Sequence, residues 1–142
     1  LAVTVFVALN PAQRLADARD SRRTSDVESV LTAIHAAIVD NKGSYPTTMP
    51  AVGTVKQLGA GASGCALVGT GNCSVAALDC ADLMANTAVD LIPYLKSMPI
   101  DPLGGTTYTS AKTGYTVIRD ANGLVTVTAC GTEAATKIEA SR

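Results

Sequence analysis

Cysteines are the residues of this chain whose types and spacing most clearly indicate chemistry, and they stand at Cys65, Cys73, Cys80 and Cys130. A zinc site usually contains closely spaced ligand pairs such as CxxC, and no such pair occurs here. The single histidine, His35, lies far upstream. We therefore expect two disulfides, which form in oxidising compartments outside the cytosol. Four cysteines allow three connectivities, and we favour the pairs Cys65–Cys73 and Cys80–Cys130.

Other residues that could bind or react do not assemble into a site. Residues 59–64 match GxGxxG, but a dinucleotide fingerprint lies between a strand and a helix, and these residues run into another glycine-rich loop. Asp101-Pro102 offers oxygens to a calcium ion without the dense Asp/Asn series of a strong calcium loop. We expect His35 to pack or to face solvent. The nucleophile motifs GxSxG and SxxK are absent. We therefore expect no catalytic residue, no cofactor and no metal.

Composition narrows the class of protein further. The 142 residues suffice for one domain with a modest core, and 47 % of them are hydrophobic. The aromatics are four Tyr and one Phe, so aliphatic side chains must fill that core. The net charge is −1, with no basic stripe of the kind that displaces counterions from nucleic acid. We expect no direct nucleic-acid binding.

The elements that must position these residues begin with a long helix over 1–41. Its later part carries apolar residues at i, i+3, i+4, i+7 and i+11, which is one helix face: Val27, Val30, Leu31, Ile34 and Ile38. Pro11 removes a backbone hydrogen bond, so we expect a kink or an unwound turn around 6–11. Asn41-Lys42-Gly43 should end the helix, with Gly43 as a left-handed cap.

The first nine residues, Leu1–Leu9, are almost wholly apolar. As a helix they would rise only ~13 Å, against ~30 Å of membrane hydrocarbon. They are therefore either a buried segment or the end of a longer apolar helix, and we favour the second interpretation. Nothing downstream is apolar enough to cover them, so one end of the helix should project from the compact part.

A band of alternating charge follows, from residue 14 to residue 28. Its opposite charges stand three or four residues apart, which is ion-pairing distance on a helix. One interpretation is a solvated face with weak ion pairs. The other is a surface complementary to neighbouring copies, formed by Arg14, Asp17, Arg19, Asp20, Arg22, Arg23 and Asp26.

The rest of the chain predicts an α+β fold. A loop-rich stretch over 50–74 precedes a second, shorter helix over 74–97 and a series of turns over 98–105. Strands are expected at 106–110, 115–119 and 124–130, and the last two should form a hairpin through Asp120-Ala121-Asn122-Gly123. We expect a mobile tail over 131–142. The predicted architecture is a long N-terminal helix packed on a small antiparallel β-sheet, with residues 1–26 protruding and 27–142 forming a globular head.

Several stretches in this order resemble bacterial type IV pilins and pseudopilins. An apolar helix end at Asn10-Pro11 runs into the ARD…R.SD-like stretch over 12–26, and GSYP follows at 43–46. Later come the P.DP.GG..Y pattern over 99–108 and the Gly114-Tyr115-Thr116-Val117 strand. The resemblance implies a ladle-like fold. It also implies an N-terminal helix that is inserted in the cytoplasmic membrane, trimmed by a prepilin peptidase, methylated and then bundled at the centre of a filament.

On this resemblance, the chain is expected to be a structural subunit of a type IV pilus, a homo-oligomeric filament at the cell surface, for adhesion, motility or DNA uptake. The pilus assembly machinery would be a further partner. The family's processing site has no counterpart here, which would place Leu1 inside the family helix. Alternatives are a pseudopilin of a type II secretion system and a monomeric, membrane-anchored extracytoplasmic binding domain. The filament-core residues would be Leu1, Val3, Val5, Phe6, Val7, Leu9 and Pro11.

Overall fold

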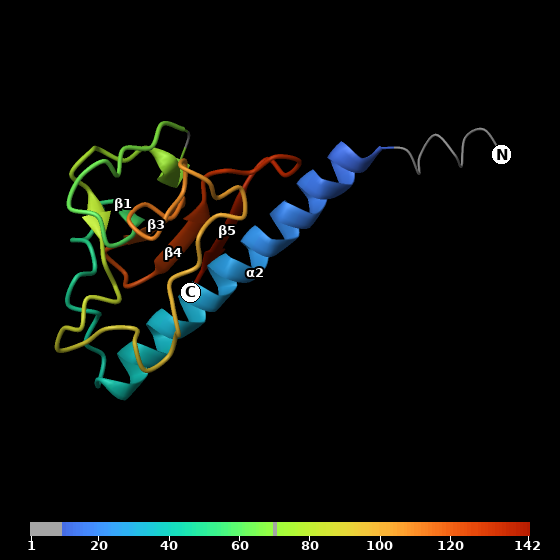
Figure 1. The fold of residues 1–142 in the computed structure, drawn as a ribbon. Helices are drawn as coiled ribbons and strands as arrows, with labels where there is room; N and C mark the ends of the chain where they lie inside the picture. Colours follow the sequence, from blue (N-terminus) through green and yellow to red (C-terminus); the bar gives the residue numbers. More distant parts are fainter. Residues whose placement is uncertain (1–9, 70) are drawn as a thin grey trace.

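The structure is a computed structural model that describes residues 10–69 and 71–142. Within these residues the fold is α+β: one long helix, α2 (Pro11–Asp40), packs along a five-stranded sheet and extends beyond it (Figure 1). A 3₁₀ turn, η1 (Gly71–Cys73), lies in the loop before β2. The strands are β1 (Lys56–Leu58), β2 (Cys80–Ala81), β3 (Tyr115–Arg119), β4 (Val125–Ala129) and β5 (Ile138–Ser141).

Local capping defines both ends of α2. The Asn10 side chain accepts a hydrogen bond from the Gln13 N–H at 3.4 Å, and Pro11 occupies the first helical position, where its missing N–H costs nothing. The expected interruption at Phe6–Pro11 lies largely outside the described residues. At the other end Gly43 has φ +89° and donates its N–H to the Ile38 carbonyl at 2.8 Å. The helix thus ends within the predicted Asn41-Lys42-Gly43 stretch, although the left-handed residue directly after the C-cap Asn41 is Lys42, at φ +56°, and Gly43 follows it.

The apolar face predicted for α2 is the one that packs on the sheet. Val27, Val30, Leu31 and Ile34 are buried, and Ile38 is half-buried. They meet side chains from β3, β4 and β5 in one aliphatic core, which also holds Val117, Val125, Val127 and Ile138. Burial of this stripe, more than intrinsic helix propensity, stabilises α2 in the head.

The sheet is mixed, which corrects the expectation of a purely antiparallel one. Its strand order is β2-β1-β3-β4-β5, and β1 pairs with β2 in parallel while the other neighbours are antiparallel. The predicted β3–β4 hairpin is confirmed. Its turn closes through the Gly123 N–H, which donates to the Asp120 carbonyl at 3.2 Å with Gly123 at φ +88°.

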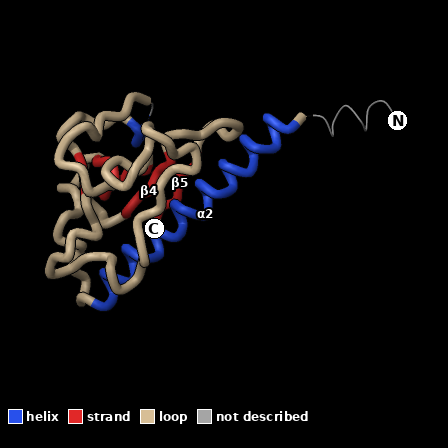
Figure 2. The backbone as a smooth tube through the Cα atoms, in the orientation of Figure 1, coloured by secondary structure: helices blue, strands red, loops and turns tan. Residues whose placement is uncertain are grey.

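The predicted helix over 74–97 is wrong: this stretch contains β2 and a series of turns. The aspartates explain the difference, because their side chains bond nearby backbone N–H groups and so compete with helix formation. Asp82 accepts from the Met84 N–H at 3.0 Å, and Asp90 accepts from the Ile92 N–H at 3.0 Å. Figure 2 shows that most of the chain between α2 and β3 is loop.

Two further predictions fail around the sheet. Residues 106–110 form turns, with a single bridge between Thr109 and Lys112, in place of a strand. The tail is not a free end, because β5 pairs with β4 along its length. Ile138 and Ala140 face inward and are buried, whereas the residues between and after them are exposed. This short alternation is the strand signal that the polar composition of the tail hides.

Candidate assembly surface

The first two turns of α2, residues 11–18, extend past the head (Figure 1). All of these residues are exposed except Ala16, which is half-exposed, and Leu15 leaves 57 % of its surface uncovered. Among the described residues, their side chains bond only one another: the Gln13 amide donates to Asp17 at 3.1 Å. This segment is therefore a helix surface that its own head does not cover.

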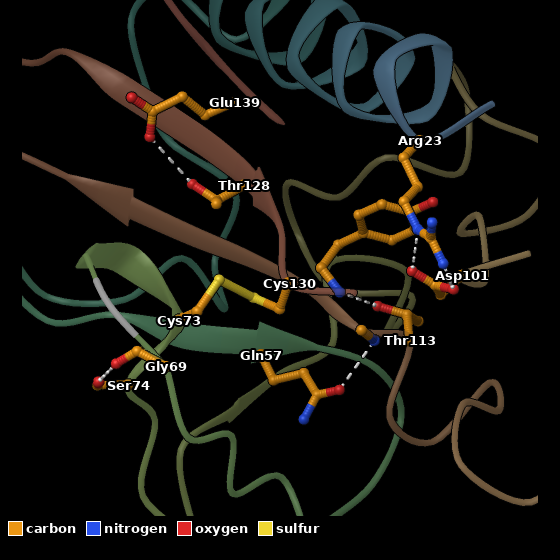
Figure 3. Close-up of a disulfide and its surroundings, with 12 residues drawn as sticks. Arg23, Gln57, Gly69, Cys73, Ser74, Asp101, Thr113, Thr128, Cys130 and Glu139 are labelled. Atoms are coloured by element: carbon orange, nitrogen blue, oxygen red, sulfur yellow. Dashed lines mark hydrogen bonds and ion pairs between the residues drawn. A yellow bond between two sulfur atoms is a disulfide. The ribbon is translucent and has the colours of Figure 1, made fainter. Parts of the chain in front are cut away.

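The attachment of α2 to the head is centred on Arg23. Its guanidinium is fully buried and binds Asp101 in a bidentate pair, Nε to Oδ2 and Nη2 to Oδ1, both at 2.8 Å (Figure 3). Nη1 donates to Asp20 at 2.8 Å and to Glu133 at 2.7 Å. One cation thus joins α2 to the 98–105 turns and to the segment before β5.

Asp20 completes this network from the helix side. Its Oδ2 accepts the backbone N–H groups of Ala134 and Ala135, each at 2.7 Å, while Oδ1 accepts from Arg23 and from the Glu133 N–H. Burial alone would raise the pKa of Asp20, but the backbone donors and Arg23 outweigh it and lower that pKa to about 2. Asp20 is therefore held as a carboxylate that fixes the backbone of residues 133–135.

Glu133 lies at the outer rim of the same network. Arg19 binds it with Nη2 to Oε1 at 2.6 Å and Nε to Oε2 at 2.7 Å, and Arg23 binds it from inside. Hydrogen bonds from Arg19, and then from Arg23, lower the pKa of Glu133 to about 2. Sequence reasoning missed Glu133 because it stands in a tail that we expected to be mobile.

The predicted charge band therefore divides into inner and outer residues. Asp20 and Arg23 are buried, and Arg19 is bound to Glu133, so these three are engaged within the chain. Asp26 accepts the Tyr115 hydroxyl at 2.6 Å and lies 4.0 Å from Arg22. Exposed members of the band are Arg14, Asp17 and Arg22.

Bonds between α2 and the head begin before residue 26, where we expected the protruding part of the helix to end. Contacts with the head start at Arg19 and are extensive at Arg23. Within the described residues the protruding part of the helix is 11–18. Asp20 and Arg23, which stand three residues apart in the charge band, form an ion pair at 2.8 Å, and it is directed into the head.

Two disulfides are present, as predicted, but their pairing corrects ours. The bonds are Cys65–Cys80 and Cys73–Cys130, and Figure 3 shows the second of them. The reason is tertiary. A chain reversal bridged by Leu67 and Val75 brings the start of this loop back beside β2. The same reversal places Cys73 beside the end of β4, where it bonds Cys130. Cys73 lies between Cys65 and Cys80 in the sequence, so the two disulfides interleave.

Asp101, considered from the sequence as a calcium ligand, is bound within the head. Both Asp101 oxygens are engaged by Arg23, and Oδ1 also accepts the Leu103 N–H at 2.9 Å. Among the described residues, no group of three or more His, Cys, Asp or Glu is arranged to hold a metal. His35 Nε2 lies 2.9 Å from the Arg142 carbonyl oxygen. Residues 59–64 form a loop, as expected.

The predicted filament-core residues can be located only in part. Pro11 is the first residue of α2, whereas the others, Leu1, Val3, Val5, Phe6, Val7 and Leu9, lie outside the described residues. Of the helices that the structure describes, none has the length and apolarity needed to cross a membrane.

Comparison with known proteins gave no match to any family model, curated protein or solved structure. The function must therefore be inferred from the structure of the chain. Its main features are a helix with an uncovered start, a buried ion network where the head begins, and a head closed by two interleaved disulfides.

Proposed function

We propose that the chain is a structural subunit of a type IV pilus, with the helices of many copies bundled at the filament centre and the heads outside. The observation that carries this proposal is the uncovered start of α2. Residues 11–18 are helical and largely exposed, and only Asn10 separates them from the apolar stretch Leu1–Leu9 in the sequence. An apolar stretch such as Leu1–Leu9 needs a partner to cover it, and in the proposed filament other copies of the same chain supply one.

The attachment of the head supports the same role. In a filament, force on the central helix must reach the head without detaching it. Arg23 is bound to three carboxylates from three segments, and the β3–β4–β5 sheet packs on the apolar face of α2. The Cys73–Cys130 bond ties the loop before β2 to the end of β4. Head and helix therefore behave as one body.

The proposed role includes insertion in the cytoplasmic membrane before assembly, processing by a prepilin peptidase and display at the cell surface. Asp101, which we considered as a calcium ligand, is bonded to Arg23, and a bound calcium ion in the head would have favoured the pseudopilin alternative. No feature of the described residues favours that alternative over a pilus subunit.

Electron microscopy of material sheared from cells that produce the chain tests the proposal. We expect filaments that mass spectrometry shows to contain this chain, and none from cells in which its gene is deleted. A well-expressed chain that yields no filaments and sediments as a monomer after extraction would favour the membrane-anchored binding domain instead.

A further inference from the structure

A shallow groove runs beside the later part of α2, on the helix side that the sheet does not cover. Its volume is about 540 Å³. One wall is the helix, where the side chains are short at Ser25, Ser29 and Thr32, and the other is the loop that carries Tyr94 and Leu95. Short side chains on one wall allow another helix to approach closely.

The charges of α2 are divided between its two parts. Residues 11–23 contain four arginines and two aspartates, whereas residues 24–40 contain three carboxylates and neither lysine nor arginine. Arg14 is exposed on the protruding segment, and Glu28 is exposed in the lining of the groove. Neither makes an ion pair within the part of the chain that the structure describes.

We propose that the groove receives residues 11–18 of a second copy of this chain, with the two α2 helices parallel. This inference rests on the proposed filament function and identifies the surface through which copies meet. Leu15 of the incoming helix lies against the short side chains of the groove, and Arg14 pairs with Glu28. Charge complementarity of this kind sets register and selects the partner.

The dimensions agree with this arrangement. Residues 11–18 form a helical segment ~12 Å long, and the groove follows the helix over residues 25–36, ~16 Å at 1.5 Å per residue. Placing residue 14 opposite residue 28 displaces the second copy by ~21 Å along the helix axis. Each copy then uses its protruding segment for one neighbour and its groove for another. Such a head-to-tail contact does not close on itself and generates a helical filament.

Charge reversal and its rescue test this contact in the full chain. Arg14→Glu and Glu28→Arg should each lower the yield of sheared filaments at least tenfold, because each places like charges together. The double variant R14E/E28R should restore the yield to within about twofold of the unsubstituted chain. Lys112→Glu, in the turn after Ser110, reverses a charge away from α2 and should leave the yield unchanged.

Ser29→Trp tests the same contact without changing a charge. The indole would fill the groove, so this variant should also form no filaments. Thermal melts of each variant verify that the head stays folded. If the unsubstituted chain forms filaments and the single charge variants do too, or if the double variant is not rescued, the groove contact is wrong while the filament function stands. If the unsubstituted chain forms no filaments, or only closed dimers, both proposals fail.

Discussion

At the scale of single residues, Arg23 decides how the helix is attached. Taking a guanidinium out of water is costly, and only closely placed partners compensate for it. Here two aspartates and a glutamate provide them, at 2.7–2.8 Å. The stability of the head should therefore depend strongly on all four charged residues, because loss of one partner leaves buried charge uncompensated.

Arg23→Ala should therefore lower the free energy of unfolding by about 3–5 kcal/mol, since Asp20 and Asp101 would remain buried without their cation. Its neighbour gives a matched control: Arg22 is 68 % exposed, so Arg22→Ala should change stability by no more than about 0.5 kcal/mol. Urea denaturation followed by circular dichroism measures both. Equal effects of the two substitutions would show that the buried network does not hold the head.

The same network predicts that the folded chain loses stability as the pH falls. The pKa values of Asp20 and Glu133 are lowered to about 2 in the folded chain, against ordinary values near 4. Their contribution to stability is therefore fully present above about pH 5 and is lost as the pH falls through 4 towards 2. Urea midpoints measured from pH 7 to pH 2 should show this decline. Asp20→Asn should flatten it, and an unchanged profile in that variant would contradict the assignment.

At the scale of elements, two kinds of contact stabilise the head. The apolar face of α2 covers one side of the sheet, where it packs on β4 and on the edge strand β5. The loops between α2 and β3 are held by disulfides. Cys65–Cys80 and Cys73–Cys130 interleave across a stretch rich in glycine and turns. A loop of this composition would otherwise be ordered at a large entropic cost.

The pairing can be tested with one substitution. Cys130→Ser should free the thiol of Cys73 and leave Cys65–Cys80 intact. Chain-entropy arguments give a loss of about 4 kcal/mol for a closed loop of this length. Alkylation of the native variant followed by peptide mass spectrometry should find the label on Cys73. A label on Cys80 would restore the pairing that the sequence spacing suggested.

At the scale of the whole molecule, the chain is asymmetric. One part of α2 is bound to the head by apolar packing and by ion pairs, and residues 11–18 have no such cover. In the proposed filament, folding and assembly would therefore use different surfaces of one helix. Changes in the protruding part should alter assembly without altering the stability of the head.

Leu15→Asp should accordingly abolish filaments while the melting temperature of the head stays within a few degrees, since Leu15 is largely uncovered in the single chain. Leu78→Asp makes the same chemical change at another exposed leucine, in a loop of the head, and should preserve filaments. Electron microscopy and thermal melts give the two readouts. Normal filaments from the Leu15 variant would show that this part of the helix is not an assembly surface.

The sequence by itself determined the features that depend on neighbouring residues. The spacing of Val27, Val30 and Leu31 predicted the buried face of α2, Gly43 predicted its end, and alternation around Asn122-Gly123 predicted the β3–β4 hairpin. Periodicity and turn chemistry act over a few residues, so each could be predicted without knowing the fold. Four cysteines were likewise enough to predict two disulfides.

Only the tertiary structure decided which distant residues meet. Arg23 binds Asp101 and Glu133 across separations of 78 and 110 residues, and the disulfide partners depend on how the loop folds back beside β2. Strands β1, β2 and β5 are too short to give a clear pattern: β1 pairs with an edge of β3, β5 pairs with an edge of β4, and β2 pairs only with β1. Such contacts depend on the global path of the chain, and no local spacing encodes that path.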